Sequence, residues 1–163
     1  MTQLSTILMP GEGEAVQIGT TTHTTFKAVG AESDDRIGLF EHRMAPGAPG
    51  ASPHIHKAQL ECFYVLEGTV ELYLDGQSFS APAGSYVQVP ESVGHGFRNP
   101  FDDEARMLIL FSPGRAREQY FRGLAALYEN GRRPTEQELQ NLMSEFDQYE
   151  LEYSGEVPGW GRH

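Results

Sequence analysis

The residues with the clearest chemical potential are two histidines, a glutamate and a third histidine further along the chain. His54 and His56 are two positions apart, so on a β-strand both side chains lie on one face. Glu61 follows the short segment 57–60, whose turn could return it on a neighbouring strand. His95 comes after a second turn-rich segment. Imidazoles with a carboxylate suit Zn, Fe, Ni, Mn or Cu better than Ca or Mg, so the set is a candidate metal site.

Three other residues near this set have alternative interpretations. Gln59 could replace Glu61 as a ligand if the turn between the strands is tighter. Strand alternation places Cys62 on the face opposite Glu61, which favours a structural role for its thiol. His42 could act as a base or a gate, although a hydrogen-bonded core histidine is the commoner role.

The elements that must position these residues are short strands, which extend to about Pro113. Apolar runs there are separated by Gly, Pro, Asp and Asn at intervals of roughly 8–12 residues, which is typical of antiparallel sandwiches and barrels. Strands do not alternate with helices, which argues against a doubly wound α/β fold. The segment 45–53 is rich in turn residues. The expected strands are 36–44, 60–66, 69–74, 86–89, 95–98 and 106–111, with a hairpin turn at Asp75–Gly76.

Beyond Pro113 the apolar spacing becomes helical. The pattern predicts a first helix over 114–130, closed by the pair Asn130–Gly131. Thr135 and Glu138 have the spacing of a capping box, which predicts the start of a second helix. This helical hairpin is too short to be a domain, so we expect it to pack on the strands. The apolar stripe of the first helix comprises Tyr120, Phe121, Leu124, Leu127 and Tyr128.

The residues around the first candidate ligands resemble the first sequence motif of the cupin superfamily. That motif reads G(X)5HXH(X)3–4E(X)6G, and the chain matches it from His54 through Glu61 to Gly68. The upstream glycine is out of register, since Gly50 is too close to His54 and Gly47 is one residue too far.

The segment around the last candidate ligand resembles the second cupin motif, which reads G(X)5PXG(X)2H(X)3N. Gly84, Pro90, His95 and Asn99 match this motif in their spacing. Ser92 stands at the turn position where this motif has its second glycine. The ligand itself is therefore retained, while the geometry of the turn differs from the family pattern.

The resemblance implies a mainly β fold, a double-stranded β-helix or jelly-roll cupin barrel over residues 35–111. Residues 1–34 would add N-terminal strands and an arm, and residues 112–163 a C-terminal helical extension packed on the barrel, all within a single domain. One divalent transition metal ion, Fe, Ni, Mn, Co or Zn, would lie inside the barrel, with open positions for water, substrate or dioxygen. The ligands implied by the resemblance are His54, His56, Glu61 and His95.

Three functions are compatible with this resemblance. The first is a metal-dependent dioxygenase, because small bacterial cupins similar to quercetin 2,3-dioxygenase share the ligand set and often end in a helical extension. Glu61 would then be both ligand and catalytic base for a substrate hydroxyl. The second is a non-redox cyclase, isomerase, lyase or hydrolase in which the metal polarises a carbonyl. The third is a cupin that binds a small ligand without turnover.

Strand alternation also predicts which side chains line the substrate pocket. A pocket rich in aromatic and thioether groups would suit a flat apolar substrate, such as a phenolic compound or a polyketide. The alternative is an ordinary core, because a barrel of this size is filled by its own side chains. The expected pocket residues are Phe40, His42, Met44, Phe63, Val65, Phe97, Met107 and Ile109.

Composition and charge narrow the range of partners. The chain has 163 residues, 12 Lys and Arg against 23 Asp and Glu, and a net charge of −11. This charge is spread along the chain and disfavours nucleic acid and anionic membrane surfaces as partners. The single cysteine and the absence of a visible signal peptide or membrane span indicate a cytoplasmic protein. We also expect a homodimer, because cupin barrels have sheet edges that need cover.

Overall fold

The structure is a computed structural model that describes residues 5–151 and Trp160. The segments 1–4, 152–159 and 161–163, which belong to the predicted N-terminal arm and C-terminal extension, lie outside the described residues. Within the described part of the chain, the strands form two sheets in which all neighbouring strands are antiparallel. In spatial order the six-stranded sheet contains β1 (Ala15–Ile18), β2 (Thr22–Ala28), β3 (Gly38–Met44), β10 (Ala105–Ser112), β5 (Leu60–Glu67) and β8 (Tyr86–Val89). The five-stranded sheet contains β11 (Tyr149–Glu150), β4 (Ala51–Ile55), β9 (His95–Arg98), β6 (Thr69–Leu74) and β7 (Gln77–Pro82).

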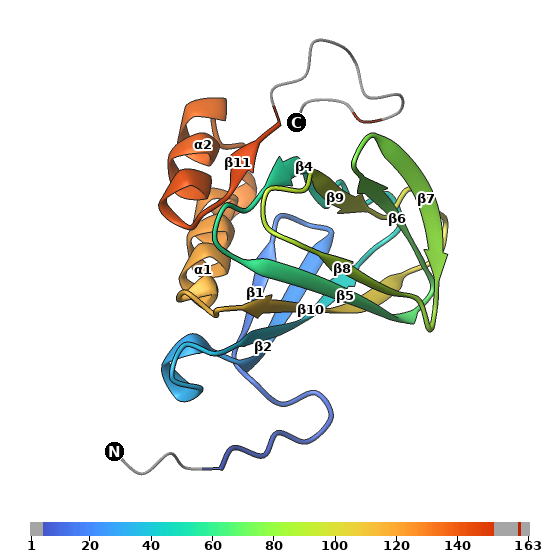
Figure 1. Ribbon diagram of the computed structural model, residues 1–163. Coiled ribbons are helices and arrows are strands. Elements are labelled where there is room, and N and C mark those ends of the chain that lie inside the picture. The colour runs from blue at the N-terminus through green and yellow to red at the C-terminus, as the bar shows by residue number, and fades with distance from the viewer. Residues whose placement is uncertain (1–4, 152–159, 161–163) are drawn as a thin grey trace.

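The two sheets face each other and enclose the core, which makes the fold a double-stranded β-helix (Figure 1). The helices α1 (Arg117–Leu127) and α2 (Glu136–Glu145) lie together on one side of the sheets, next to β11. The predicted mainly β jelly roll with a C-terminal helical pair is therefore confirmed. No helix among the described residues is long and apolar enough to cross a membrane.

One strand lies where the sequence indicated only turns. β4 begins at Ala51, inside the turn-rich segment 45–53, and it contains Pro53. Its pairing with β9 is irregular between Ala51 and His54, so the missing N–H of Pro53 falls at a break in the ladder. The irregularity explains why alternation and propensity did not predict this strand.

The first helix begins later than its apolar pattern predicts. Arg115 and Ala116 have φ angles of 45° and 51°, which is left-handed backbone, so the helix starts at Arg117 instead of Gly114. A Cβ on Gly114 would lie 2.7 Å from the carbonyl oxygen of Ile37, which leaves room only for glycine at this approach. The helix also ends early, at Leu127, and the predicted terminator 130–131 falls in a following 3-10 turn, Glu129–Gly131.

The second helix begins as predicted. Thr135 Oγ1 accepts a hydrogen bond from the backbone N–H of Glu138 at 3.2 Å, and Glu138 Oε2 accepts one from the backbone N–H of Thr135 at 2.8 Å. This reciprocal pair is a capping box, which satisfies two N–H groups that the first helical turn leaves without partners.

The core follows the alternation of the strands. On β5, Glu61, Phe63 and Val65 are buried, whereas Tyr64 between them is 44% exposed. Cys62 lies on the outward face of β5 with Tyr64, where Tyr86 Oη donates to its Sγ at 3.5 Å. Side chains with 1% exposure or less fill the inner faces of the neighbouring strands, namely Phe40, Met44, Met107, Ile109 and Phe111.

Candidate metal centre

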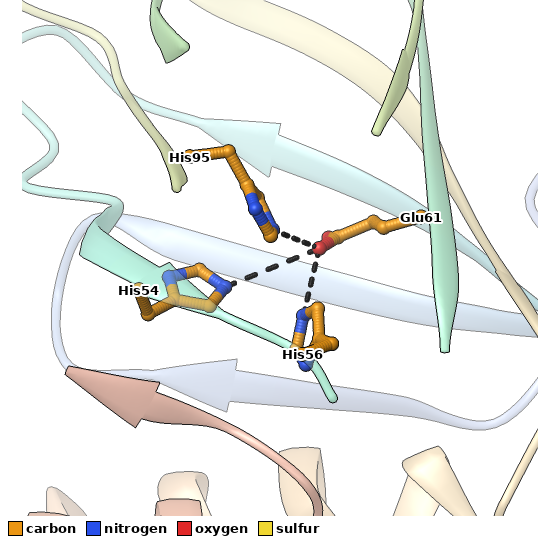
Figure 2. Close-up of side chains that lie close together, drawn as sticks. All are labelled: His54, His56, Glu61 and His95. Carbon is orange, nitrogen blue, oxygen red and sulfur yellow. Dashed lines mark hydrogen bonds and ion pairs between the residues drawn. The ribbon is translucent and has the colours of Figure 1, made fainter. Parts of the chain in front are cut away.

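Both sheets contribute to the candidate metal centre. His54, near the end of β4, is the cross-strand partner of His95 at the start of β9, and His56 directly follows β4. Glu61 lies on β5 in the opposite sheet. Figure 2 shows the Glu61 carboxylate pointing toward the imidazoles of all three histidines.

The four side chains converge on a single point inside the barrel. Glu61 Oε2 lies 2.6 Å from His95 Nε2, 2.9 Å from His56 Nε2 and 4.0 Å from His54 Nε2 (Figure 2). The candidate ligand atoms all lie within 4.8 Å of one another, and all four residues are at most 2% exposed. The structure thus brings together the set that spacing alone could only suggest.

Hydrogen bonds determine which ring nitrogen of each histidine faces the cluster. The Nδ1 atoms of His54, His56 and His95 lie 2.7, 2.6 and 2.8 Å from the carbonyl oxygens of Ser52, Asp147 and Val93. A carbonyl can only accept, so each Nδ1 carries a hydrogen and donates it. Nε2 of each neutral ring is then an acceptor, like the carboxylate oxygen that it faces.

This arrangement fits a cation. Two acceptors at 2.6–2.9 Å repel each other unless a proton or a metal ion lies between them. Metal-bound imidazoles characteristically donate their other ring N–H to a carbonyl or carboxylate, which is the pattern observed here. The buried cluster therefore suggests a metal ion, with donors of a type that suits a transition metal.

The electrostatics keep the carboxylate of the cluster ionised. Burial acts to raise the pKa of Glu61, but His95 and His56, whose Nε2 atoms face the carboxylate and attract it when protonated, hold that pKa well below its usual range. Burial lowers the pKa of His54 well below its ordinary value, and the charges of His95 and His56 lower it further. Burial also opposes charge on His95, yet Glu61 raises its pKa. Glu61 is thus a fixed negative charge that attracts a proton or a cation.

The departure from the second cupin motif does not disturb the turn. Ser92 adopts the left-handed conformation that a glycine would supply, with φ of 64°, and its N–H donates to the carbonyl oxygen of His56 at 2.7 Å. Gln59, the alternative ligand, instead donates from Nε2 to the carbonyl oxygen of Pro113 at 2.9 Å.

A cavity of about 1,170 Å³ opens onto the cluster. His54 and Glu61 line it at the barrel, and Tyr120 and Phe121 of α1 line it from the helical side. His42 also lines the cavity, and its Nδ1 lies 2.9 Å from Thr24 Oγ1. Burial lowers the pKa of His42 to about 4, so the ring is neutral at pH 7.

The expected pocket residues separate into two groups. His42, Phe97 and Ile109 line the cavity. The other five are buried core residues and are not among its lining, namely Phe40, Met44, Phe63, Val65 and Met107. These five residues therefore match the alternative considered above, in which the side chains of the barrel fill an ordinary core.

The sequence interpretation missed three polar residues at the cavity and its edge. Arg117 and Gln148 line the cavity, and Asp147 supports His56. Arg117 precedes Tyr120 and Phe121 by three and four residues, so helical periodicity alone could have placed it on the apolar face. No sequence signal identifies Asp147 or Gln148, which reach the site from a distant part of the chain.

A jelly roll with three imidazoles and a carboxylate inside it defines the cupin class of barrel. Residues 40–111 match the family model described as Cupin domain. Residues 40–111 of this chain thus form a cupin domain.

Comparisons with individual proteins agree with this class. The chain is 41% identical over 70 residues to the polyketide synthase CurC of Streptomyces cyaneus, a match that covers 43% of this chain and 45% of that protein. It is 36% identical over 94 residues to quercetin 2,3-dioxygenase of Bacillus subtilis (strain 168), covering 56% of this chain and 27% of that protein. The matches thus span less than half of each curated relative. The structure of KdgF from Halomonas sp. superposes with a TM-score of 0.62 at 19% identity, over 71% of this chain and 99% of that chain, which shows a common fold.

Proposed function

We propose that this chain is a metal-dependent dioxygenase that acts on a small aromatic or phenolic substrate, such as a flavonol or a polyketide. The observation that carries the proposal is the convergence of three Nε2 atoms and Glu61 Oε2 at the wall of a large cavity. The similarity to a quercetin 2,3-dioxygenase and to a polyketide synthase supports this substrate class.

The proposed ligands are His54, His56, Glu61 and His95, which would hold one divalent ion of Fe, Ni, Mn, Co or Zn. When bound, such an ion would supply a Lewis acid and, if redox-active, electrons for dioxygen chemistry. The backbone carbonyls at the three Nδ1 atoms keep the rings oriented without the ion.

Glu61 would act on the substrate as well as hold the ion. Its carboxylate lines the cavity and stays ionised, so it can accept a hydrogen bond and then the proton of a substrate hydroxyl. The aromatic rings of Phe97, Tyr120 and Phe121 line the same cavity and would hold a flat substrate against this carboxylate.

A second candidate is a non-redox cyclase or isomerase, and His42 favours it. The His42 ring is neutral at pH 7, lines the cavity and has no hydrogen-bond partner for Nε2 among the described residues. A neutral imidazole can donate or accept a proton through that nitrogen, depending on its tautomer, and dioxygen is then unnecessary.

The test combines metal analysis with turnover. We expect elemental analysis to find about one transition metal ion per chain in the wild type and in a His23→Ala control, which removes an exposed histidine. A His54→Ala variant should lose most of this metal, and equal metal content in His54→Ala and wild type would overturn the site.

Protein loaded with Fe, Ni, Mn or Co should consume oxygen with a flavonol, and Glu61→Gln should slow this reaction by about 10²-fold or more. Turnover that is unchanged without oxygen would select the second candidate. Oxygen consumption by none of the loaded forms would contradict the dioxygenase proposal.

A further inference from the structure

Arg117 is a buried cation whose role the metal cluster does not explain. It is the first residue of α1, is 3% exposed and lines the cavity. Its guanidinium lies 4.0 Å from the ring centroid of Tyr120 and 4.6 Å from that of Phe111. Nη1 donates to the carbonyl oxygen of Phe146 at 2.8 Å.

The hydrogen bonds of Arg117 go to neutral groups. Nη2 donates to the amide oxygen of Gln148, and Nε is buried without a partner. No carboxylate among residues 5–151 lies within ion-pair distance of Arg117, and the charges of Glu61 and Asp147 act on it only from further away. Burying an unpaired charge is costly, and aromatic faces offset only part of that cost.

The buried part of the cavity holds two charged side chains besides its histidines, Arg117 and Glu61. The other charged residues of the lining are all exposed to solvent, namely Glu129, Arg132, Arg133, Glu136 and Glu150. A divalent cation held by the four-residue cluster would offset Glu61 and leave Arg117 as a further positive charge. Gln148 and Tyr120, which lie near Arg117, are neutral polar groups, so an anion is the ligand that this buried part favours.

Strained backbone directly precedes Arg117 and fixes its position. The two preceding residues are both left-handed, which costs energy for residues other than glycine. Gln59, two residues before Glu61, donates to the carbonyl oxygens of Pro113 and Gly114 at 2.9 and 3.4 Å, which ties this turn to the cluster. The first turn of α1 is therefore held in place relative to Glu61.

We propose that Arg117, with Gln148 and Tyr120 beside it, forms a subsite that binds the carboxylate of an aromatic acid. Nε has no partner but is shielded from solvent, so an entering carboxylate would displace the neutral oxygen of Gln148 from Nη2 and bond both nitrogens. Phe97, Phe121 and Tyr120 supply aromatic faces for the ring of the acid. This inference rests on the proposed function only in that it takes the same cavity as the substrate site.

The test compares an acid with its neutral isostere, using 2-naphthoate and 2-naphthamide as probes. We expect the full-length wild type to bind the acid at least about tenfold more tightly than the amide. A hydrogen bond between charged groups strengthens binding by at least about this factor. The preference should disappear in Arg117→Met and persist in Arg122→Met, which removes a partly exposed arginine of the same helix.

Nuclear magnetic resonance on arginine-labelled wild type provides a readout that needs no variant. The Nε–H signal of Arg117, assigned by its loss in Arg117→Lys, should shift with the acid and not with the amide. Equal affinities of wild type for the two probes, an acid preference that survives in Arg117→Met, or an unmoved Nε–H signal at saturation would overturn the subsite.

Performing these titrations on metal-free and on zinc-loaded protein separates the subsite from the metal centre. In both forms, the wild type should bind the acid more tightly than the amide, and this preference should depend on Arg117. A preference seen only with zinc and unchanged in Arg117→Met would assign the carboxylate to the metal and overturn our inference. Failure of the proposed function would appear elsewhere, as absent metal or absent turnover, while the acid preference of metal-free protein remained.

Discussion

Each cluster histidine donates one ring N–H to a backbone carbonyl, but the carbonyls differ in origin. His54 and His95 use carbonyls two residues earlier, so their orientation is a local property of the strand or turn that carries them. His56 uses the carbonyl of Asp147, 91 residues later. The orientation of one of the three rings therefore depends on the C-terminal part of the chain.

The buried His42 predicts a specific dependence of stability on pH. The unfolded histidine takes up a proton below pH 6.5, whereas folded His42 stays neutral until its pKa of about 4, so the free energy of unfolding falls as the pH drops across this window. The difference of roughly two units or more corresponds to about 3 kcal/mol at pH 4.

We expect urea denaturation of metal-free His42→Asn to show a correspondingly smaller loss of stability between pH 7 and pH 4 than wild type. His23→Asn, which removes an exposed histidine, should keep most of the wild-type loss, because burial is the main cause of the lowered His42 pKa and the charge of His23 is a smaller one. Parallel pH profiles for wild type and His42→Asn would contradict this assignment of the depressed pKa.

At the scale of elements, the segment that links α2 to β11 forms part of the site. Three consecutive residues act there: Phe146 and Gln148 accept hydrogen bonds from Arg117, and Asp147 supports His56. The Asp147 carboxylate also accepts from the N–H groups of Lys57 and Ala58 at 3.0 and 2.8 Å. The helical extension therefore holds the loop between β4 and β5 as well as covering the barrel.

Removing the Asp147 carboxylate should weaken metal binding. Asp147 has φ of 57°, so Asp147→Gly removes the carboxylate while relieving the left-handed backbone. The loop that carries His56 would loosen, and we expect zinc affinity to fall about tenfold, the usual effect of losing support for a ligand. Competition with a chromogenic chelator measures this affinity.

Asp34 provides the matched control, because it is also left-handed, with φ of 56°, and lies exposed just after the 3-10 helix Gly30–Glu32. Asp34→Gly should leave zinc affinity unchanged. An unchanged affinity in Asp147→Gly would show that the carboxylate does not position His56.

The whole molecule combines an acidic surface with a buried arginine, Arg117, that has no ion pair among the described residues and lines the cavity. Of the chain's charges, 23 are acidic and 12 are basic. Several arginines are paired with acids, as Arg106 is with Glu41 and Glu67 and Arg122 is with Glu14, and the acids still outnumber the bases. Salt screens such exposed charge within about 10 Å, whereas the buried Arg117 is screened far less. Long-range repulsion and local attraction can therefore coexist for an anionic ligand.

We expect the molecule to pair through the edge of its larger sheet. β8 is an edge strand, and Tyr86 on it is 59% exposed opposite Tyr64, which is 44% exposed. Light scattering at micromolar concentration should give about twice the chain mass of 18.1 kDa.

Tyr86→Lys should shift this mass toward the monomer, because a charge at the edge opposes pairing. Gln119→Lys, which adds the same charge at an exposed position of α1, should not. A wild-type mass of one chain would refute the predicted dimer. A Tyr86→Lys variant that is still a dimer would show that this edge is not the dimer interface.

The strands of the barrel and the second helix could be predicted from the sequence because their signals are local. Alternation placed Phe63 and Val65 inside and Tyr64 outside, and the spacing of Thr135 and Glu138 marked a helix start. β4 and the start of α1 were not predictable in this way. A broken ladder accommodates Pro53, and tertiary contacts stabilise two left-handed residues that local propensity disfavours.

The sequence by itself determined the four candidate ligands, because a family motif records residue types and spacing. Only the tertiary structure decided what surrounds them. For each expected pocket residue, strand alternation predicts that the side chain points inward. It does not predict whether that side chain lines a cavity or packs in the core. Arg117, Asp147 and Gln148 reach the site through the packing of the helical extension against the barrel. Contacts between residues some 30 to 90 positions apart arise from that packing, and no local pattern encodes them.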